Sequence, residues 1–243
     1  MSDVTHGHLL NGRVRYAQPA RGFRSGIEPV LLAASVPVRA GQRVLEGGTG
    51  AGAGLLCLLT RVSGVEGVGI ERDPDQAGLA RENAAANGFS DLAVLTGNIE
   101  SVVPDGIFDH GFANPPYHPA AGTMSPNQSR ATAKRAAPDL LAIWATALTR
   151  PLKPRGTLSF IVPASLLPSC IAAMAAAGSP AAAILPLWPK SMVPAKLVIV
   201  RGIKGGRRPP RLLPGLVLHE ADGRFTQAAD AILRDAAALN LDH

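Results

Sequence analysis

The chain has 243 residues, of which 47% are hydrophobic and 17% are charged, enough apolar side chains for one compact core. Its formal net charge is +6, from 24 lysines and arginines against 18 carboxylates. The most apolar run, residues 171–185, is interrupted by Gly178 and Pro180 and is too short to span a bilayer, and the first ten residues lack an apolar signal, so we expect a soluble, cytoplasmic protein without a membrane partner.

The first half of the chain alternates apolar segments with segments of helical pattern, after a polar, arginine-rich start at residues 1–25. Pro74 in a first turn and the pair Asn87-Gly88 at an end are typical helix boundaries. The elements that we expect are a helix at 29–35, a strand at 43–46, a helix at 53–62, a strand at 67–71, a helix at 74–87, and strands at 92–96 and 108–113.

The second half continues this alternation after a loop at 114–137. The expected elements are a helix at 138–148, a strand at 157–162, a helix at 165–177, strands at 182–187 and 196–201, and one more strand and a helix within 216–242. Strands alternating with helices predict an α/β fold with a mostly parallel sheet and helices on both faces. The two late strands, close in sequence, predict an antiparallel edge strand, which fits the seven-stranded, Rossmann-like sheet of a class I methyltransferase better than a plain dinucleotide-binding fold.

We expect residues 1–243 to form a single domain with three parts. An N-terminal extension and lead-in helix reach to about residue 40, a cofactor-binding core covers about 41–202, and a basic loop, a strand and a helix cover about 203–243. The two cysteines, Cys57 and Cys170, lie far apart in apolar segments and are interpreted as buried thiols. The histidines lack the spacing of metal ligands, so no metal site is expected.

Charge is distributed unevenly along the chain. Between Val44 and Asp109 there are three basic and ten acidic residues, whereas the rest of the chain carries 21 basic and eight acidic ones. The basic residues gather within 13–43, 130–155 and 201–211. This asymmetry indicates a cofactor half plus basic surfaces that can meet a polyanion, or else arginines that serve only solubility.

Three glycines, Gly48, Gly50 and Gly52, directly follow the first core strand. Glycine permits tight turns and lets backbone amides approach a ligand, but proteins that bind NAD, FAD or S-adenosylmethionine (SAM) all use such a run. Glu71 ends the next strand, where its carboxylate can accept hydrogen bonds from two ribose hydroxyls. Asn98 follows the third strand, where its amide can bond an adenine edge. The sequence therefore predicts a nucleotide-cofactor site at these strand ends.

The sequence Asn114-Pro115-Pro116-Tyr117 follows the fourth strand, beside the switch point where open α/β sheets bind ligands. An exocyclic base amine is a weak nucleophile because its lone pair is delocalised into the ring. Asn114 Oδ1 and the Pro115 carbonyl can accept its two hydrogens, the prolines stiffen the loop, and Tyr117 can stack on a flipped base. This pattern predicts methylation of an amine by positioning and electrostatics, without a metal or covalent nucleophile.

Glu46-Gly-Gly-Thr-Gly50, Glu71 and Asn114–Tyr117 resemble the motifs of SAM-dependent amino-methyltransferases. Within these, residues 24–32, 130–134 and 223–226 resemble the bacterial tRNA1(Val) adenine-37 N6-methyltransferase family, over about residues 10–239. The resemblance implies SAM as cofactor, a structured RNA as substrate, and cofactor contacts from Glu46 and Glu28. Glu28 can equally be a helix N-terminal acid.

The chain departs from this family in three places. Glu46-Gly47 replaces the usual Asp-Leu, Asn98 replaces a frequent aspartate, and His118-Pro-Ala-Ala replaces acidic and aromatic residues after the proline motif. These departures bear on the identity of the nucleotide more than on the chemistry. His118 is not needed as a base, because an amine can lose its proton after methyl transfer.

Several further residues carry weaker expectations. Trp144 and Trp188 are interpreted as core residues. The sequence Arg207-Arg208-Pro209-Pro210 can be an RNA-facing loop or a charged turn. Phosphate contacts are weakly expected from three basic residues after the proline motif, which are Arg130, Lys134 and Arg135.

The leading hypothesis is methylation of adenine N6 in tRNA, at position 37 of a valine tRNA by resemblance, with no obligate protein partner. Guanine N2 in ribosomal RNA and a protein glutamine remain alternatives. Glutamine methyltransferases normally carry a helical domain before the first motif, and only about forty residues precede Val44 here. A SAM-sensing or RNA-binding protein without catalysis is a hypothesis of another class, and a dehydrogenase is disfavoured by the proline motif.

Overall fold

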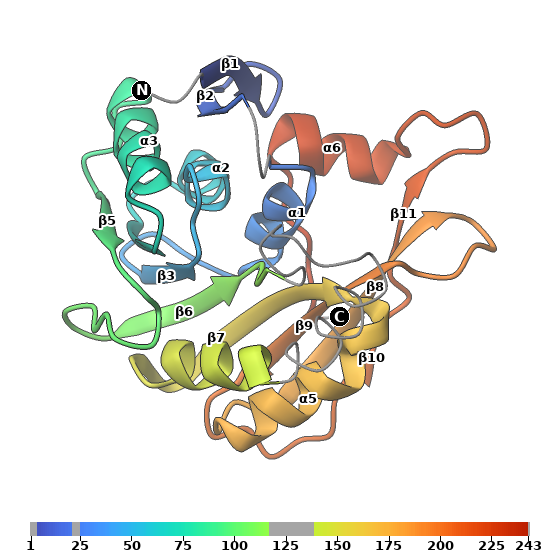
Figure 1. The fold of residues 1–243 in the computed structure, drawn as a ribbon. Helices are drawn as coiled ribbons and strands as arrows, with labels where there is room; N and C mark the ends of the chain where they lie inside the picture. Colours follow the sequence, from blue (N-terminus) through green and yellow to red (C-terminus); the bar gives the residue numbers. More distant parts are fainter. Residues whose placement is uncertain (1–3, 21–24, 117–138, 243) are drawn as a thin grey trace, which may run out of the picture.

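The computed structural model describes residues 4–20, 25–116 and 139–242 (Figure 1). In this part of the chain, nine strands form one sheet in the order β10-β8-β9-β7-β6-β3-β4-β5, with β11 also paired to β8. The strands are β3 (Arg43–Gly47), β4 (Glu66–Glu71), β5 (Leu92–Thr96), β6 (Phe108–Ala113), β7 (Leu152–Pro163), β8 (Ala181–Lys190), β9 (Leu197–Ile203), β10 (Arg211–Leu212) and β11 (Leu216–His219).

The seven strands expected from the sequence are β3 to β9, and the α/β class I arrangement is confirmed. The antiparallel strand β9, however, lies between β7 and β8 instead of at the edge of the sheet. One strand was expected in the tail, but two short ones, β10 and β11, continue the sheet along the outer edge of β8. Pro214, which has no N–H to donate, and Gly215 separate them.

Helices cover both faces of this sheet because its strands alternate apolar residues between two cores. Val44 packs into the core beneath α1 (Glu28–Ser35), α2 (Ala53–Arg61) and α6 (Gln227–Asp235). The next residue, Leu45, packs into the opposite core beneath helical residues 139–149 and α5 (Leu167–Ala176), which follows the short 3-10 helix η1 (Ala164–Leu166). In the described residues, no helix has the length and apolar character needed to cross a bilayer.

An N-terminal hairpin of β1 (Val4–Leu9) and β2 (Val14–Pro19) forms a separate two-stranded sheet that the sequence analysis did not predict. Its signals are present in the sequence. Asn11-Gly12 occupies the turn with positive φ angles of 54° and 88°, and every second residue of β2, Val14 and Tyr16, faces inward and is buried.

Two asparagines of α3 (Pro74–Ala86) and its C-cap attach this hairpin to the core. Asn83 accepts the N–H of Ala17 and donates to the Ala17 carbonyl, both at 2.8 Å. One helical turn later, Asn87 makes the same pair of bonds with Arg15, at 2.8 and 2.7 Å. Two residues four apart in a helix are spaced about as far along its axis as two residues two apart along a strand. The amides of Asn83 and Asn87 therefore bond alternate residues of β2, as a third strand would.

Arg201 does not contribute to a basic surface, although it belongs to the basic cluster 201–211 of the sequence. It lies on β9 with 3% of its surface exposed, and it donates to the Ser35 carbonyl at the end of α1 and to Asp242 Oδ1 at 3.0 Å. Arg61 donates to the Ala33 and Val36 carbonyls at 3.0 and 2.8 Å. The buried Arg201 and the half-buried Arg61 thus donate to carbonyls at the C-terminal end of α1.

We predict that Arg201→Met lowers the free energy of unfolding by roughly 2 kcal/mol, because the buried Ser35 carbonyl loses its donor. The lost ion pair adds little, since the Asp242 side chain is 67% exposed. Urea unfolding at constant m-value measures the effect. The control is Arg211→Met, which removes bonds to Leu241 and Asp242 at the surface and should cost less than about 1 kcal/mol. Equal losses in the two variants would contradict this assignment.

Candidate active site

The loop between β3 and α2 lies where two parallel strands end side by side. Gly47 of β3 pairs with Ile70 of β4, so the loop that follows Gly47 adjoins Glu71. Gly48 has a φ of +63°, and a Cβ built on it would lie 2.6 Å from Trp144 Cη2. Glycine is therefore required at this position by backbone conformation and by the neighbouring indole. Trp144 is buried, as expected, and forms a wall of this loop.

Glu46 is buried at the end of β3, with 5% of its surface exposed. Its Oε2 accepts the Thr49 hydroxyl at 2.5 Å and the Leu55 N–H at 3.2 Å. Burial raises the pKa of Glu46 to about 8, these two hydrogen bonds oppose the shift, and the nearby charge of Glu71 adds to it. The carboxyl group thus holds both ends of the glycine loop, and the protein favours its protonated form at neutral pH.

Glu71 fastens the same loop from the neighbouring strand. Its Oε2 accepts the Gly50 N–H at 2.8 Å, and its Oε1 accepts the Asp73 N–H at 2.9 Å. Each carboxylate oxygen can accept a second hydrogen bond, so Glu71 retains acceptor capacity for ligand hydroxyls. Glu46 and Glu71, predicted separately from the sequence, thus hold neighbouring residues of one loop, since Glu46 bonds Thr49 and Glu71 bonds Gly50.

The two other cofactor candidates lie further from this group. Asn98 is exposed in the loop after β5, where its Oδ1 accepts the Glu100 N–H at 3.3 Å and its Nδ2 donates to Glu100 Oε2 at 3.0 Å. Since Thr96 pairs with Glu71, this loop starts at the same edge of the sheet. Glu28 is half-buried in the first turn of α1, with its carboxylate against Gly26.

The proline motif begins where β6 ends. Ala113 pairs with Gly47 on one side and with Phe160 of β7 on the other, so the motif adjoins the start of the glycine loop. Asn114 is half-buried, Pro115 is buried and Pro116 is exposed. The remaining candidates after this point lie outside the described residues: Tyr117, His118, Arg130, Lys134 and Arg135.

Asn83 is a site residue that the sequence analysis missed. Besides its two bonds to the hairpin, its Nδ2 donates to the Ala51 carbonyl of the glycine loop at 2.9 Å, and only 3% of its surface is exposed. A polar residue on the inward face of the 74–87 helix pattern was the available signal. Tyr16 extends this connection, because its hydroxyl bonds Ser25 Oγ at 2.8 Å in the segment that leads to Glu28.

The thiols are buried as expected, and burial raises the pKa values of Cys57 and Cys170 to about 12. Trp188 is half-buried and donates from Nε1 to the Pro214 carbonyl at 3.0 Å. Within the described ranges, no group of three histidine, cysteine, aspartate or glutamate residues is arranged to hold a metal ion.

The raised pKa of Glu46 predicts a pH-dependent stability. Because the folded pKa of about 8 exceeds the value of 4.5 for a free glutamate, the folded protein binds an extra proton between these limits. The contribution of Glu46 to stability is therefore present at low pH and is lost as the pH rises toward 8, by up to about 1.4 kcal/mol per unit. Glu46→Gln, which keeps a carbonyl oxygen for Thr49 and Leu55, should remove this slope.

Urea unfolding of wild type and Glu46→Gln at pH 6, 7 and 8 tests this expectation. The difference in unfolding free energy should move in favour of the variant as the pH rises. Glu66→Gln is the control at an exposed carboxylate, and it should show no such trend over this range. A difference between wild type and Glu46→Gln that stays constant with pH would contradict the raised pKa.

Comparisons with known proteins agree with this geometry. Residues 28–142 match the methyltransferase small domain family. A tRNA1(Val) (adenine(37)-N6)-methyltransferase of Porphyromonas gingivalis is 32% identical over 160 residues, which cover 60% of this chain and 61% of that relative. The match thus spans about three fifths of the relative's length. A protein of the same name from Aeromonas hydrophila is 28% identical over 209 residues, covering 84% of this chain and 86% of the relative.

The fold also agrees with a solved structure. The crystal structure of a predicted O-methyltransferase from Agrobacterium tumefaciens matches with a TM-score of 0.73 and 24% identity, over 89% of this chain and 100% of that one. At this identity the likeness supports the fold alone. The chain therefore has the class I methyltransferase fold, and its residues 28–142 match the methyltransferase small domain family.

Proposed function

We propose that the protein transfers the methyl group of SAM to the N6 amine of an adenine in tRNA. The observation that carries this proposal is the pairing of Ala113 with Gly47, which puts Asn114 beside the glycine loop. An acceptor for an amine and a cradle for a nucleotide thus adjoin each other. The relatives named as tRNA1(Val) adenine-37 N6-methyltransferases support adenine 37 of a valine tRNA as the target.

The residues around the glycine loop suit SAM. The loop offers backbone amides without side chains in the way, and Glu71 keeps acceptor capacity for the ribose hydroxyls. Asn98 would bond the adenine edge, while Glu46 and Glu28 would lie toward the cationic methionine part. When bound, SAM supplies an electrophilic methyl group on a positively charged sulfur.

The chain's own part in the reaction is to orient the amine. Asn114 Oδ1 and the Pro115 carbonyl accept the two amine hydrogens, which localises the lone pair on nitrogen and aims it at the methyl carbon. SAM would supply the methyl group and leave with its sulfur neutral, and the methylated nitrogen would lose one proton to solvent, so the chain needs no dedicated base. Pro115 and Pro116 hold the carbonyl rigid, and Tyr117 would stack on the base.

Asn114→Ala should lower kcat at least about 100-fold, because one of the two acceptors is lost, while the Kd for SAM stays within about twofold. Isothermal titration gives the Kd, and methyl incorporation into RNA gives kcat. Asn98→Ala is the matched control at the cofactor end, where we expect weaker SAM binding but near-normal kcat at saturating SAM. Normal turnover in Asn114→Ala would rule out the mechanism.

The substrate is tested with labelled SAM and hypomodified RNA, separated into tRNA and ribosomal RNA and digested for nucleoside mass spectrometry. N6-methyladenosine in the tRNA fraction supports the proposal. N2-methylguanosine in the ribosomal fraction would replace it with a guanine methyltransferase. Label in a release-factor glutamine, with none in RNA, would replace the RNA substrate altogether.

A further inference from the structure

Two basic segments that lie about fifty residues apart in sequence meet at the amino end of the sheet. The Arg155 N–H donates to the Lys204 carbonyl at 3.1 Å, and the Lys204 N–H donates to the Gly156 carbonyl at 2.9 Å. Lys204 Nζ also reaches the Arg150 carbonyl at 3.0 Å. These bonds join the two segments, and we call their six cations the basic rim, in which Arg207 and Arg208 follow Lys204 in the chain: Arg150, Lys153, Arg155, Lys204, Arg207 and Arg208.

Most of the basic rim faces solvent. Arg150, Arg155, Arg207 and Arg208 are exposed, and the Lys153 side chain is 41% exposed. Arg155 has a φ of +68°, a conformation that favours glycine, at an exposed position of β7 where the pairing with β6 shifts register between Leu152 and Thr157. Packing in the core therefore does not explain why arginines occupy these exposed positions.

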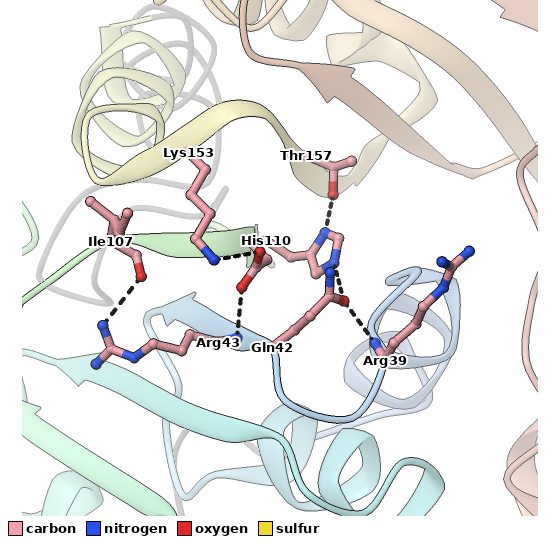
Figure 2. A network of polar contacts seen from close by, with 8 residues as sticks. Arg39, Gln42, Arg43, Ile107, His110, Lys153 and Thr157 are labelled. Atoms are coloured by element: carbon pink, nitrogen blue, oxygen red, sulfur yellow. Dashed lines mark hydrogen bonds and ion pairs between the residues drawn. The ribbon is translucent and has the colours of Figure 1, made fainter.

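The carboxylate nearest the basic rim is already engaged. Asp109 Oδ1 accepts Lys153 Nζ at 2.8 Å, and its Oδ2 accepts the Arg43 N–H at 3.0 Å. Figure 2 shows Lys153 in this network, where His110 bonds Thr157 and Gln42, and Gln42 in turn accepts the N–H of Arg39. Burial lowers the pKa of His110 to about 4; the charge of Asp109 opposes this shift, and the charges of Arg201, Lys153 and Arg39 add to it. At or just before the starts of the described strands β4, β5 and β6, the carboxylates are fewer than the six cations of the basic rim: Glu66, Asp91, Asp105 and Asp109.

The opposite end of the sheet has the reverse charge on its cofactor side. There Glu71, Asp73, Asp75 and Glu100 lie at or just beyond the ends of β4 and β5, accompanied by Arg72. Phosphates of a large RNA are repelled from this surface and attracted to the basic rim. Leu152 pairs with Phe108 at the start of β6, so the rim lies about 20 Å along the strand from Asn114.

We propose that the basic rim binds the phosphate backbone of the RNA substrate at a distance from the methylated nucleotide. This inference rests on the proposed function for the identity of the RNA. A contact about 20 Å from Asn114 requires a folded RNA that extends well beyond its target loop. The rim thus selects large structured RNA over short oligonucleotides without reading any base.

The test is the double variant Arg207→Gln/Arg208→Gln, with tRNA binding measured by fluorescence anisotropy between 50 and 200 mM salt. Loss of two phosphate contacts should weaken binding roughly tenfold at 50 mM salt and reduce the salt slope by about 1 to 2. The KM for tRNA should rise in parallel, while kcat at saturating tRNA and the Kd for SAM remain those of wild type.

The control is Arg224→Gln/Arg234→Gln, which removes the same total charge at exposed arginines paired with Asp222 and Asp230. It should bind tRNA nearly as wild type does. Equal behaviour of the two double variants would overturn the proposal, since total charge would then explain the binding. So would tRNA binding that is unchanged in the rim variant while its binding to anionic lipid vesicles is lost.

The proposed function and this inference fail in different ways. If wild type binds tRNA through the basic rim but forms no methylated nucleoside, the RNA-binding role of the rim is supported and the proposed methylation is contradicted. If wild type forms N6-methyladenosine in tRNA and the rim variant binds and reacts equally well, the proposed methylation is supported and the RNA-binding role of the rim is contradicted.

Discussion

The candidate site depends on two carboxylates that grip one loop from adjacent strands. Glu46 holds Thr49 and Leu55, and Glu71 holds Gly50, so the loop between β3 and α2 is fixed before any ligand arrives. Glu71 bonds the Gly50 N–H of the loop, and Glu46 bonds the Thr49 hydroxyl and the Leu55 N–H. These bonds orient the backbone of the loop. The neighbouring pairing of Ala113 with Gly47 then brings the proline motif to this prepared surface. The proposed cofactor site and the proposed amine acceptor are both positioned by the parallel register of β3, β4 and β6.

A parallel sheet also separates the two ends of the molecule by charge. The parallel strands β3, β6 and β7 run from the end of the sheet that carries the basic rim to the end that carries the candidate active site. The acids of the cofactor side suit a ligand with hydroxyl and ammonium groups, and they disfavour phosphates. The cations of the basic rim, at the opposite end, attract phosphates. The same topology that positions a small ligand thus leaves a distant surface available for a polyanion.

The core of the fold and the cofactor end could be predicted from the sequence because their signals are local. The glycine run, Glu71 and the apolar strands around them are each a few residues long, and α3 begins at Pro74 as expected. The hairpin has local signals in its Asn11-Gly12 turn and its alternating strand, but its attachment to the core through Asn83, 66 residues from Ala17, has no local sequence pattern. Arg201 was misassigned because adjacency in sequence does not tell which face of a strand a residue occupies. The basic rim required knowing that Arg155 and Lys204 pair.

The end of α1 has an implication for the order in which the protein can be completed. Its carbonyls receive donors from Arg201 and from the Leu239 N–H, which bonds Ala34 at 2.9 Å. These donors are synthesised about 165 and 205 residues after the helix they complete. During translation α1 can pack on α2 as soon as α2 has been made, but the Ser35 and Ala34 carbonyls lack these donors until the last strands and the tail after α6 have emerged.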